Sequence, residues 1–309
     1  MITAFTLNVS IDRRYVVDNA AVGAVNRVRE CTASAGGKGL NVARVIHALD
    51  TDVTAAGIAG GALGEFIRQQ LDAENIRHHF TKTSGETRCC INIYDTVTGT
   101  QTEFLEPGAP VSPSEFSRFL ADFDELCADS DIITISGSLP KGLEADTYAT
   151  LIKRADDMGK RVLLDVSGTP LAAALDAHPW YIKPNEDEIA AVAKLQAITD
   201  EQLRDAAAAL CRRGISRVVI SLGARGAMLA CSDGVFIATP PHIDTANTVG
   251  CGDAMTAAFA VAAIRNMTPP DALRFAVAVS AASAMDPRTG GLNPADADAL
   301  LPHITVQSL

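Results

Sequence analysis

Metal-binding and disulfide-forming cysteine patterns are missing from this sequence of 309 residues. Its seven cysteines include no Cys-x-x-Cys pair and no Cys/His pair at zinc spacing, and most stand in apolar or alanine-rich surroundings. The six histidines form no cluster along the chain. These absences predict reduced, buried thiols in a cytoplasmic protein and exclude a zinc site or a disulfide framework.

Positive charge is also scarce. Lys and Arg number 26 against 37 Asp and Glu, which gives a net charge of −11. That balance argues against a nucleic-acid partner or an acidic membrane surface, although cations gathered locally would still bind a small anion. No apolar run reaches membrane-spanning length, and the first residues do not read as a signal peptide, so we expect no membrane partner. There is no tandem repeat, low-complexity tract or long linker.

What the sequence does have is the composition of a globular protein with a large core, 48% hydrophobic and 20% charged. Apolar strands at the start (2–8 and 52–58) are followed, from about residue 110, by regular alternation of strands and helices. We predict the later strands at 131–136, 161–166, 180–183, 217–221, 227–230 and 234–237. The pattern indicates one α/β domain over residues 1–309, with a mostly parallel sheet covered by helices on both faces.

Other segments alternate polar and apolar residues, as strands with one wet face do. They are residues 12–17 and 26–30, and a predicted hairpin of 88–94 with 101–105. We expect them to form a small sheet standing off the main core, a lid made of about residues 10–34 and 86–106. The alternative is a structural edge of the main sheet.

The most informative stretch is residues 247–264, a turn that passes through Gly250 and Gly252 into a long alanine-rich segment, which we predict to be a buried helix. Two glycines before a helix let a ligand approach the backbone, and the free N–H groups of the first turn attract an anion. Asp253 stands in that turn, where a carboxylate would repel the anion. It either accepts a proton from an attacking hydroxyl or merely caps the helix.

A second glycine turn, residues 35–39, opens another predicted helix with Lys38 at its mouth. It lacks the longer loop and the Gly-Lys-Ser/Thr of a Walker motif, so alone it indicates phosphate only weakly. Nor is any strand followed by the Gly-x-Gly-x-x-Gly of a dinucleotide-binding dehydrogenase. Polar or glycine-rich segments stand at the ends of four predicted strands, and they contain Ser138, Asp165, Lys183 and Ser221. Each could be only a turn, but in a parallel sheet all of them would converge on one crevice.

Together these motifs resemble those of carbohydrate kinases of the ribokinase superfamily, the PfkB type. Both family signatures are present, Gly-Gly-Lys-Gly-x-Asn-Val at 36–42 and Thr-Val-Gly-Cys-Gly-Asp at 248–253, in the order and separation of the family. The resemblance covers essentially the whole chain. Segments 8–12, 25–28, 85–88, 102–108 and 136–142 are most similar to those of the 1-phosphofructokinase and tagatose-6-phosphate kinase branch.

The resemblance implies roles for individual residues. Asp253 would be the catalytic base, and the N–H groups around Gly250, Cys251 and Gly252 would stabilise the transferring phosphoryl group. The substrate-binding set would be Asp12, Arg27, Gly37, Lys38, Asn41, Arg88, Glu103 and Ser138. In that set, Asp12 and Asn41 would hold sugar hydroxyls, and Lys38, Arg88 and Arg27 would clamp the phosphate already on the sugar, because a dianion needs concentrated positive charge.

For the nucleotide, the resemblance implies binding of ATP by Lys183, Asn185, Ser221, Gly223 and Gly226. Asn185 and Glu188 would position Mg²⁺, partly through its waters. Without the family, residues 184–188 read as an ordinary helix start, since proline followed by acidic residues is a common first turn.

One departure concerns Asn247, which stands where many members of the superfamily have an Asp associated with a monovalent-cation loop. Potassium activation is therefore left open.

The expected activity is ATP-dependent phosphorylation of fructose 1-phosphate to the bisphosphate, with tagatose 6-phosphate as the alternative substrate. A non-catalytic sugar-phosphate sensor on the same fold is a more distant alternative, because a sensor has no use for Asp253. Lid sheets in this superfamily often pair between subunits, so a homodimer is plausible.

Overall fold

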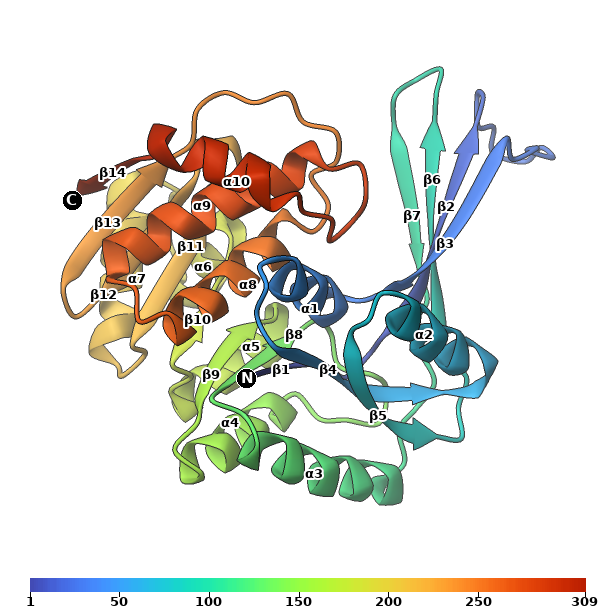
Figure 1. Ribbon diagram of the computed structural model, residues 1–309, viewed down its shortest axis with the longest axis horizontal. Helices are drawn as coiled ribbons and strands as arrows, with labels where there is room; N and C mark the ends of the chain where they lie inside the picture. The colour runs from blue at the N-terminus through green and yellow to red at the C-terminus, as the bar shows by residue number, and fades with distance from the viewer.

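Apolar strands and amphipathic helices build a large sheet with helices on both faces, and a small sheet projects from it (Figure 1). The computed structural model describes residues 1–309. In spatial order, the large sheet consists of β14 (Thr305–Ser308), β13 (Gly234–Thr239), β12 (Ala227–Cys231), β11 (Arg217–Ser221), β10 (Tyr181–Ile182), β9 (Arg161–Asp165), β8 (Ile132–Ser136), β1 (Ile2–Thr6), β4 (Val53–Gly60) and β5 (Arg77–Thr83). Neighbours from β11 to β5 are parallel, while β12, β13 and β14 continue the sheet in antiparallel pairs. The predicted mostly parallel sheet is confirmed.

Two hydrophobic cores lie on opposite faces of this sheet. Successive strand residues point to opposite sides, so Ile2 and Ala4 of β1 enter one core and Phe5 enters the other. The first core is covered by α1 (Lys38–Ala48), α2 (Gly61–Ala73), α8 (Cys251–Ile264), α9 (Pro269–Met285) and α10 (Pro294–Leu300). The second is covered by α3 (Pro113–Ala128), α4 (Thr147–Asp157), α5 (Gly168–Ala174), α6 (Glu186–Ala193) and α7 (Asp200–Arg212). Three short 3₁₀ turns complete the chain: η1 (Leu175–Ala177), η2 (Gly223–Arg225) and η3 (Leu301–His303).

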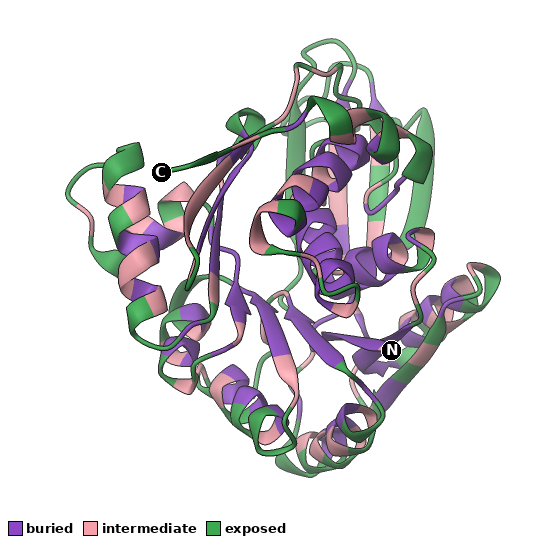
Figure 2. Cartoon of the chain, turned by 60° about the vertical axis from the view of Figure 1, so that its left-hand side comes forward, coloured by how far each residue is buried: buried purple, intermediate pink, exposed green.

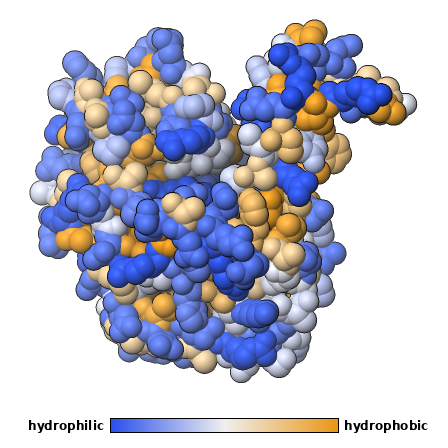
Figure 3. Space-filling view, turned by 45° about the vertical axis from the view of Figure 1, so that its right-hand side comes forward, coloured by the Kyte–Doolittle hydropathy of each residue, from blue (hydrophilic) through white to orange (hydrophobic).

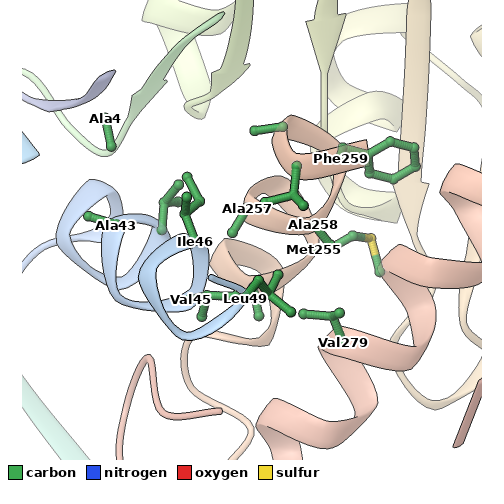
Figure 4. Close-up of a cluster of buried hydrophobic side chains, with 14 of the residues drawn as sticks. Ala4, Ala43, Val45, Ile46, Leu49, Met255, Ala257, Ala258, Phe259 and Val279 are labelled. Carbon is green, nitrogen blue, oxygen red and sulfur yellow. The ribbon is translucent and has the colours of Figure 1, made fainter. Parts of the chain in front are cut away.

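Helix α8 is buried on every side, as its alanine-rich sequence predicts. Figure 2 shows it among the buried segments, and Figure 4 shows Ala257 of α8 beside Ile46 of α1, in the same apolar cluster as Leu49, which directly follows α1. Small side chains allow α1, α8 and α9 to approach closely. The core therefore fixes the starts of α1 and α8 relative to each other, and the two glycine turns precede these starts. No helix of the protein has both the length and the apolar character needed to cross a membrane.

The small sheet has the strand order β3-β2-β6-β7 and stands apart from the main body (Figure 1). Its strands are β3 (Glu30–Gly36), β2 (Ser10–Val17), β6 (Arg88–Asp95) and β7 (Gln101–Leu105). This confirms a separate sheet, including the hairpin of β6 and β7. The strand predicted at residues 26–30 is wrong: residues 26–29 belong to the loop after β2, and pairing with β2 begins at Glu30 and runs through Gly36.

Two strands at the edges of the large sheet were not predicted. β5 contains one buried apolar residue, Phe80, among polar ones, and β14 has no fully buried residue. Edge strands of this kind lack the apolar run that marks a central strand, so their pairing is decided by tertiary contacts.

Candidate active site

The amino end of α8 has the backbone geometry of an anion site. Gly250 precedes the helix with φ at 91°, a left-handed conformation that favours glycine. The first helical hydrogen bond runs from Ala254 N to Gly250 O at 2.9 Å, and the N–H groups of Gly250, Gly252 and Asp253 donate to no acceptor in the protein. The N–H of Cys251 makes a long bond of 3.4 Å to Thr248 O. These free donors, with the positive end of the helix dipole, are suited to bind a phosphoryl group.

Asp253 is buried in this turn, 5% exposed, and does not cap its helix through a side-chain hydrogen bond. Its Oδ2 accepts a hydrogen bond of 2.9 Å from Asn41 Nδ2 in α1. Burial and the nearby carboxylate of Asp165 raise the pKa of Asp253 to about 7, against the opposing effect of Lys38, Asn41 and Lys183. A carboxylate with a pKa near neutrality is matched to general-base chemistry at physiological pH. The structure thus disfavours the capping alternative.

Asp165, at the end of β9, holds two lysines beside Asp253. Its Oδ1 lies 3.4 Å from Lys38 Nζ and its Oδ2 lies 3.4 Å from Lys183 Nζ. Thr256 in α8 donates a further hydrogen bond of 3.3 Å to Oδ2. Burial alone would raise the pKa of Asp165, but the two ammonium groups outweigh it and hold the pKa below its usual value. The same pairing raises the pKa of Lys38, so Lys38 stays charged in the site.

Sequence reasoning gave Asp165 no role, although it noted the residue at a strand end. The available signal was a charged residue directly after the buried run Val162–Leu164. A buried carboxylate must be paired, and two lysines from distant segments pair with this one.

At Gly37, Gly137 and Gly252 the backbone packs closely around the lysines that pair with Asp165. Gly37 precedes α1 with φ at 111°. A Cβ at Gly252 would lie 3.0 Å from Lys183 Nζ, and one at Gly137 would lie 3.8 Å from Lys38 Cβ. The ends of β8, β9 and β10 and the starts of α1 and α8 therefore converge at one edge of the sheet, as the sequence predicted.

The small sheet contributes Asp12 and Glu103 to the same region. Asp12 accepts a hydrogen bond of 2.6 Å from Ser10 Oγ, and a Cβ on Gly36 would collide with its carboxyl carbon at 2.1 Å. Burial raises the pKa of Asp12, and the charge of Glu103 adds to the rise, while Arg88 and Arg44 oppose it. Glu103 accepts from Asn92 Nδ2 at 3.2 Å. The carboxylates of Asp12 and Glu103 and the guanidinium groups of Arg88 and Arg44 are therefore close enough for their charges to shift the pKa of Asp12.

The three cations of the expected phosphate clamp are not gathered in one place. Lys38 pairs with Asp165, while the Arg88 guanidinium donates to the carbonyls of Asn8 (3.0 and 3.2 Å) and Glu106 (3.1 Å). Arg27 is exposed in the loop of residues 18–29, at the tip of the small sheet farthest from the large one (Figure 1), and makes no hydrogen bond or ion pair within the chain. Of the three, Arg88 lines a cavity at the base of the small sheet.

That cavity, of about 440 Å³, lies between the base of the small sheet and the loop after β8. Its polar lining residues are Asn8, Arg88, Glu106, Ser138 and Lys141, and the others are apolar residues that come mainly from the end of β7 and from the loops after β7 and β8. Asn8 Nδ2 donates to Ser138 Oγ at 3.1 Å, which fixes the serine at the cavity wall. Sequence reasoning did not assign Asn8 a role, because an isolated amide after a strand carries no distinctive signal.

Asn185 and Glu188 form a reciprocal capping box at the start of α6. Asn185 Oδ1 accepts from Glu188 N at 2.8 Å, and Glu188 Oε2 accepts from Asn185 N at 2.9 Å. This is the ordinary helix start that the residues alone suggested. The Asn185 amide N and the second Glu188 oxygen stay free, and the charge of Glu188 acts on Lys38. No group of three or more His, Cys, Asp or Glu side chains stands together to hold a metal ion. The free Glu188 oxygen fits Mg²⁺ bound largely by phosphate oxygens and water, because Mg²⁺ keeps several of its waters and takes only one or two carboxylates.

The remaining predicted nucleotide residues lie next to this helix start. Ser221 ends β11 and pairs with Asn185 through an isolated bridge. Gly223 has φ at 58° and faces open space, whereas a Cβ on Gly226 would meet Ala238 O at 2.0 Å. Gly226 is therefore required by packing, and Gly223 leaves room for a ligand. Asn247 Nδ2, at the departure from the family pattern, donates to Thr289 Oγ1 at 3.1 Å and to Pro287 O at 3.4 Å.

Comparison with known proteins agrees with this geometry. Residues 6–296 match the model of the pfkB family of carbohydrate kinases. The chain is 36% identical to a tagatose-6-phosphate kinase of Staphylococcus epidermidis over 99% of both sequences. It is 29% identical to the solved phosphofructokinase-2 of Escherichia coli in complex with fructose-6-phosphate, with a TM-score of 0.90 and 98% of each chain covered.

A ribokinase of Thermotoga maritima, 22% identical, shares the fold with a TM-score of 0.80 over 98% of this chain and 99% of that one. The α/β architecture with its separate small sheet is thus ribokinase-like. From its match to the family model and its coverage of a curated relative, this chain belongs to the pfkB family of carbohydrate kinases.

Proposed function

We propose that the protein transfers the γ-phosphoryl group of ATP to a primary hydroxyl of a ketohexose monophosphate, giving the bisphosphate. The observation that carries the proposal is the buried Asp253, with its pKa raised to about 7, beside unpaired N–H groups at the start of α8. The carboxylate accepts the hydroxyl proton as the oxygen attacks phosphorus, and the N–H groups stabilise charge on the transferring group. A sensor protein would have no need of a buried, deprotonatable acid at this position.

The sugar lies across the turn of Gly36 and Gly37, between Asp253 and the cavity. Asp12 and Asn41 flank this path, and both are held by hydrogen bonds within the protein. The phosphate already on the sugar is bound at the cavity, where Arg88 retains free N–H donors beside Ser138 Oγ. Arginine suits this role because its planar fork binds two phosphate oxygens together.

The nucleotide phosphates contact Lys183 and the amino end of α8, and the nucleotide extends along Ser221 and Gly223. Lys183 is 6% exposed and already faces this helix end. Asn185 and Glu188 hold the hydration shell of Mg²⁺, which neutralises charge on the β- and γ-phosphates. The protein residues supply position and charge, and no residue needs to form a covalent bond.

Two substrates compete for the sugar site. Fructose 1-phosphate, phosphorylated at the 6-hydroxyl, is our first candidate. Similarity to the Staphylococcus epidermidis tagatose-6-phosphate kinase favours tagatose 6-phosphate, phosphorylated at the 1-hydroxyl. Both have a phosphate at one end and a primary hydroxyl at the other, so the same base and cavity serve either.

A coupled assay of ADP release tests the proposal with fructose 1-phosphate, tagatose 6-phosphate, fructose 6-phosphate and unphosphorylated fructose in parallel. We expect one of the ketohexose monophosphates to give the highest kcat/KM and free fructose to give the lowest. Asp253→Asn should abolish most turnover, by at least about 100-fold, with little change in KM. Preference for the free sugar would refute the phosphate site, and near-normal turnover of Asp253→Asn would refute the base.

The small sheet also supports a homodimer. By strand register, Asp12, Asn92 and Glu103 share one face, whereas Ile91 and Phe104 share the other. Phe104 is 58% exposed, and hydrophobic side chains gather on the projecting sheet and along its base (Figure 3). An apolar sheet face on a projecting element is suited to pair with the same face of a second copy. Sedimentation should show that the wild type is a dimer and that Phe104→Glu is a monomer. A monomeric wild type would refute the homodimer.

A further inference from the structure

A chain of polar contacts leads from the surface of the protein to Asp253 through two residues of α1. Glu74, at the end of α2, accepts from Arg44 Nε at 2.7 Å and from Arg44 Nη2 at 3.2 Å. The third nitrogen, Arg44 Nη1, reaches Asn41 Oδ1 at 3.5 Å. Asn41 Nδ2 in turn donates to Asp253 Oδ2 at 2.9 Å. Three side chains from α1 and α2 thus stand in sequence behind the acid.

The direction of the Asn41 amide follows from the chemistry of Arg44. A guanidinium group has only donors, so it requires the amide oxygen on its side. The amide nitrogen is then the group turned toward Asp253, and it can only donate. A reversed amide would set its NH₂ group against the guanidinium and offer Asp253 an oxygen, which suits a protonated acid and not a carboxylate.

The amide has little freedom to move elsewhere. Asn41 is 6% exposed, and the backbone of Gly290 packs on it so closely that a Cβ there would lie 2.8 Å from Asn41 Oδ1. Arg44 is 15% exposed and is held by Glu74 through two of its nitrogens. Side chains confined in this way hold one orientation, which is what a reacting group requires of its supports.

We propose that Arg44 is a positioning residue for the catalytic base: it fixes the orientation of the Asn41 amide, which holds Asp253 as an oriented, charged proton acceptor. Glu74 anchors Arg44 in that role. This inference rests on the proposed function, in which Asp253 is the base, and it adds two residues that do not touch the reacting atoms.

Other charged groups also act on Asp253 and bear on any test. Asp165 from β9, Lys183 after β10 and Lys38 from α1 face it, and the thiol of Cys251 is its neighbour in the turn. The loop after α9 carries Asp286 and Arg288, which pair with each other at 2.8 Å. Arg44 itself also favours the charged form of Asp12, so its removal can affect sugar binding as well.

The experiment compares Arg44→Met, Arg44→Lys and Glu74→Gln with the wild type. Arg44→Met should lower kcat about tenfold, as misplacement of a reacting group does, and move the acidic limb of the kcat profile up by about one pH unit. Arg44→Lys, still a donor without acceptors, should retain kcat within about threefold. Glu74→Gln should shift the profile in the same direction by less, and it decides the matter if Arg44→Met does not fold.

Arg68→Met is the matched control, since Arg68 is a similarly covered arginine of α2, 20% exposed, that pairs with Glu65 away from the site. It should leave the profile unchanged. If Arg44→Met has the kcat of the wild type and the same acidic limb in its kcat profile, the proposal is overturned. A loss confined to KM also overturns it, because that result assigns Arg44 to Asp12 or to the sugar.

A second readout separates this inference from the proposed function. Carbon-13 NMR titration of the Asp253 carboxyl group, assigned with Asp253→Asn, needs no turnover. The pKa of Asp253 should be higher in ligand-free Arg44→Met than in the wild type. If the pKa of Asp253 shifts in Arg44→Met but the wild type is inactive, the kinase reaction is refuted and the positioning role of Arg44 stands. If the wild type is active but the pKa does not shift, only the positioning role of Arg44 is refuted.

Discussion

The pH dependence of kcat/KM is the sharpest test of Asp253 as the base. Burial and the charge of Asp165 raise its pKa to about 7, so the free enzyme holds the acid mainly protonated at pH 6 and mainly ionised at pH 8. The ionised fraction is about 9% at pH 6 and about 91% at pH 8, and kcat/KM should therefore rise about tenfold between them. The measurement is a coupled assay across pH 5.5 to 9 at low sugar phosphate.

Two controls isolate Asp253 from other titrations. The second ionisation of a sugar phosphate, near pH 6, gives its own limb and is measured separately by ³¹P NMR. Asp165→Asn removes a neighbouring negative charge and frees Lys38 and Lys183 to act on Asp253, so it should move the limb to lower pH. A wild-type profile that stays flat after correction for the substrate, or a limb that Asp165→Asn does not move, would refute the electrostatic argument.

Three further outcomes follow from the same geometry. Arg88→Ala should raise KM for the sugar phosphate about tenfold or more and leave kcat within a few-fold, because Arg88 faces the cavity and not the base; steady-state kinetics with an unchanged KM would remove Arg88 from the phosphate site. Gly36→Ala should weaken sugar binding measured by calorimetry, since its Cβ would meet the Asp12 carboxyl at 2.1 Å, and normal affinity would contradict that contact. Asp253→Asn should raise Tm at pH 8 while it lowers turnover. Because the pKa of Asp253 is raised in the folded protein, the stability that the neutral acid contributes is full below pH 3.8 and is lost as pH rises through about 7, a cost of up to about 4 kcal/mol. An equal or lower Tm of Asp253→Asn at pH 8 would show that ionised Asp253 does not destabilise the fold.

Local patterns in the sequence were enough to predict the architecture. Strand–helix alternation gave the parallel sheet, and the alanine-rich run after Gly252 gave the buried helix α8. The strands that were missed or misplaced, β3, β5 and β14, have polar or exposed sequences in which pairing partners, not periodicity, decide the structure. Pairing with β2 extends β3 through Gly36, a residue that the sequence suggested only as part of a turn.

The candidate site was predictable as a set of motifs but not as a set of contacts. Gly250–Asp253 and Lys38 could be found because glycine turns before helices have a recognisable form. That Lys38 pairs with Asp165, and that Arg88 donates to the Asn8 and Glu106 carbonyls, depends on segments more than ten residues apart in sequence. The resemblance to the family implied a three-cation clamp, whereas the fold of this chain separates Lys38, Arg88 and Arg27.

The pairing of Asp165 with two lysines explains how this site can hold charged groups before any ligand binds. The carboxylate of Asp165 and the ammonium group of Lys183 are both buried, and either would be costly without a partner, whereas Lys38 is 44% exposed. Asp165 lies 3.4 Å from each ammonium nitrogen, longer than the usual charge-assisted hydrogen bond. Each ammonium group keeps donors for a phosphate, so binding needs no rearrangement of the cluster. A nucleotide that retains net negative charge then disfavours the charged form of Asp253 and strengthens it as a base. The acidic limb of kcat, which reports the complex, should therefore lie at higher pH than that of kcat/KM, which reports the free enzyme. If both limbs coincide, the phosphoryl group does not act on Asp253, and the two sites are farther apart than the fold implies.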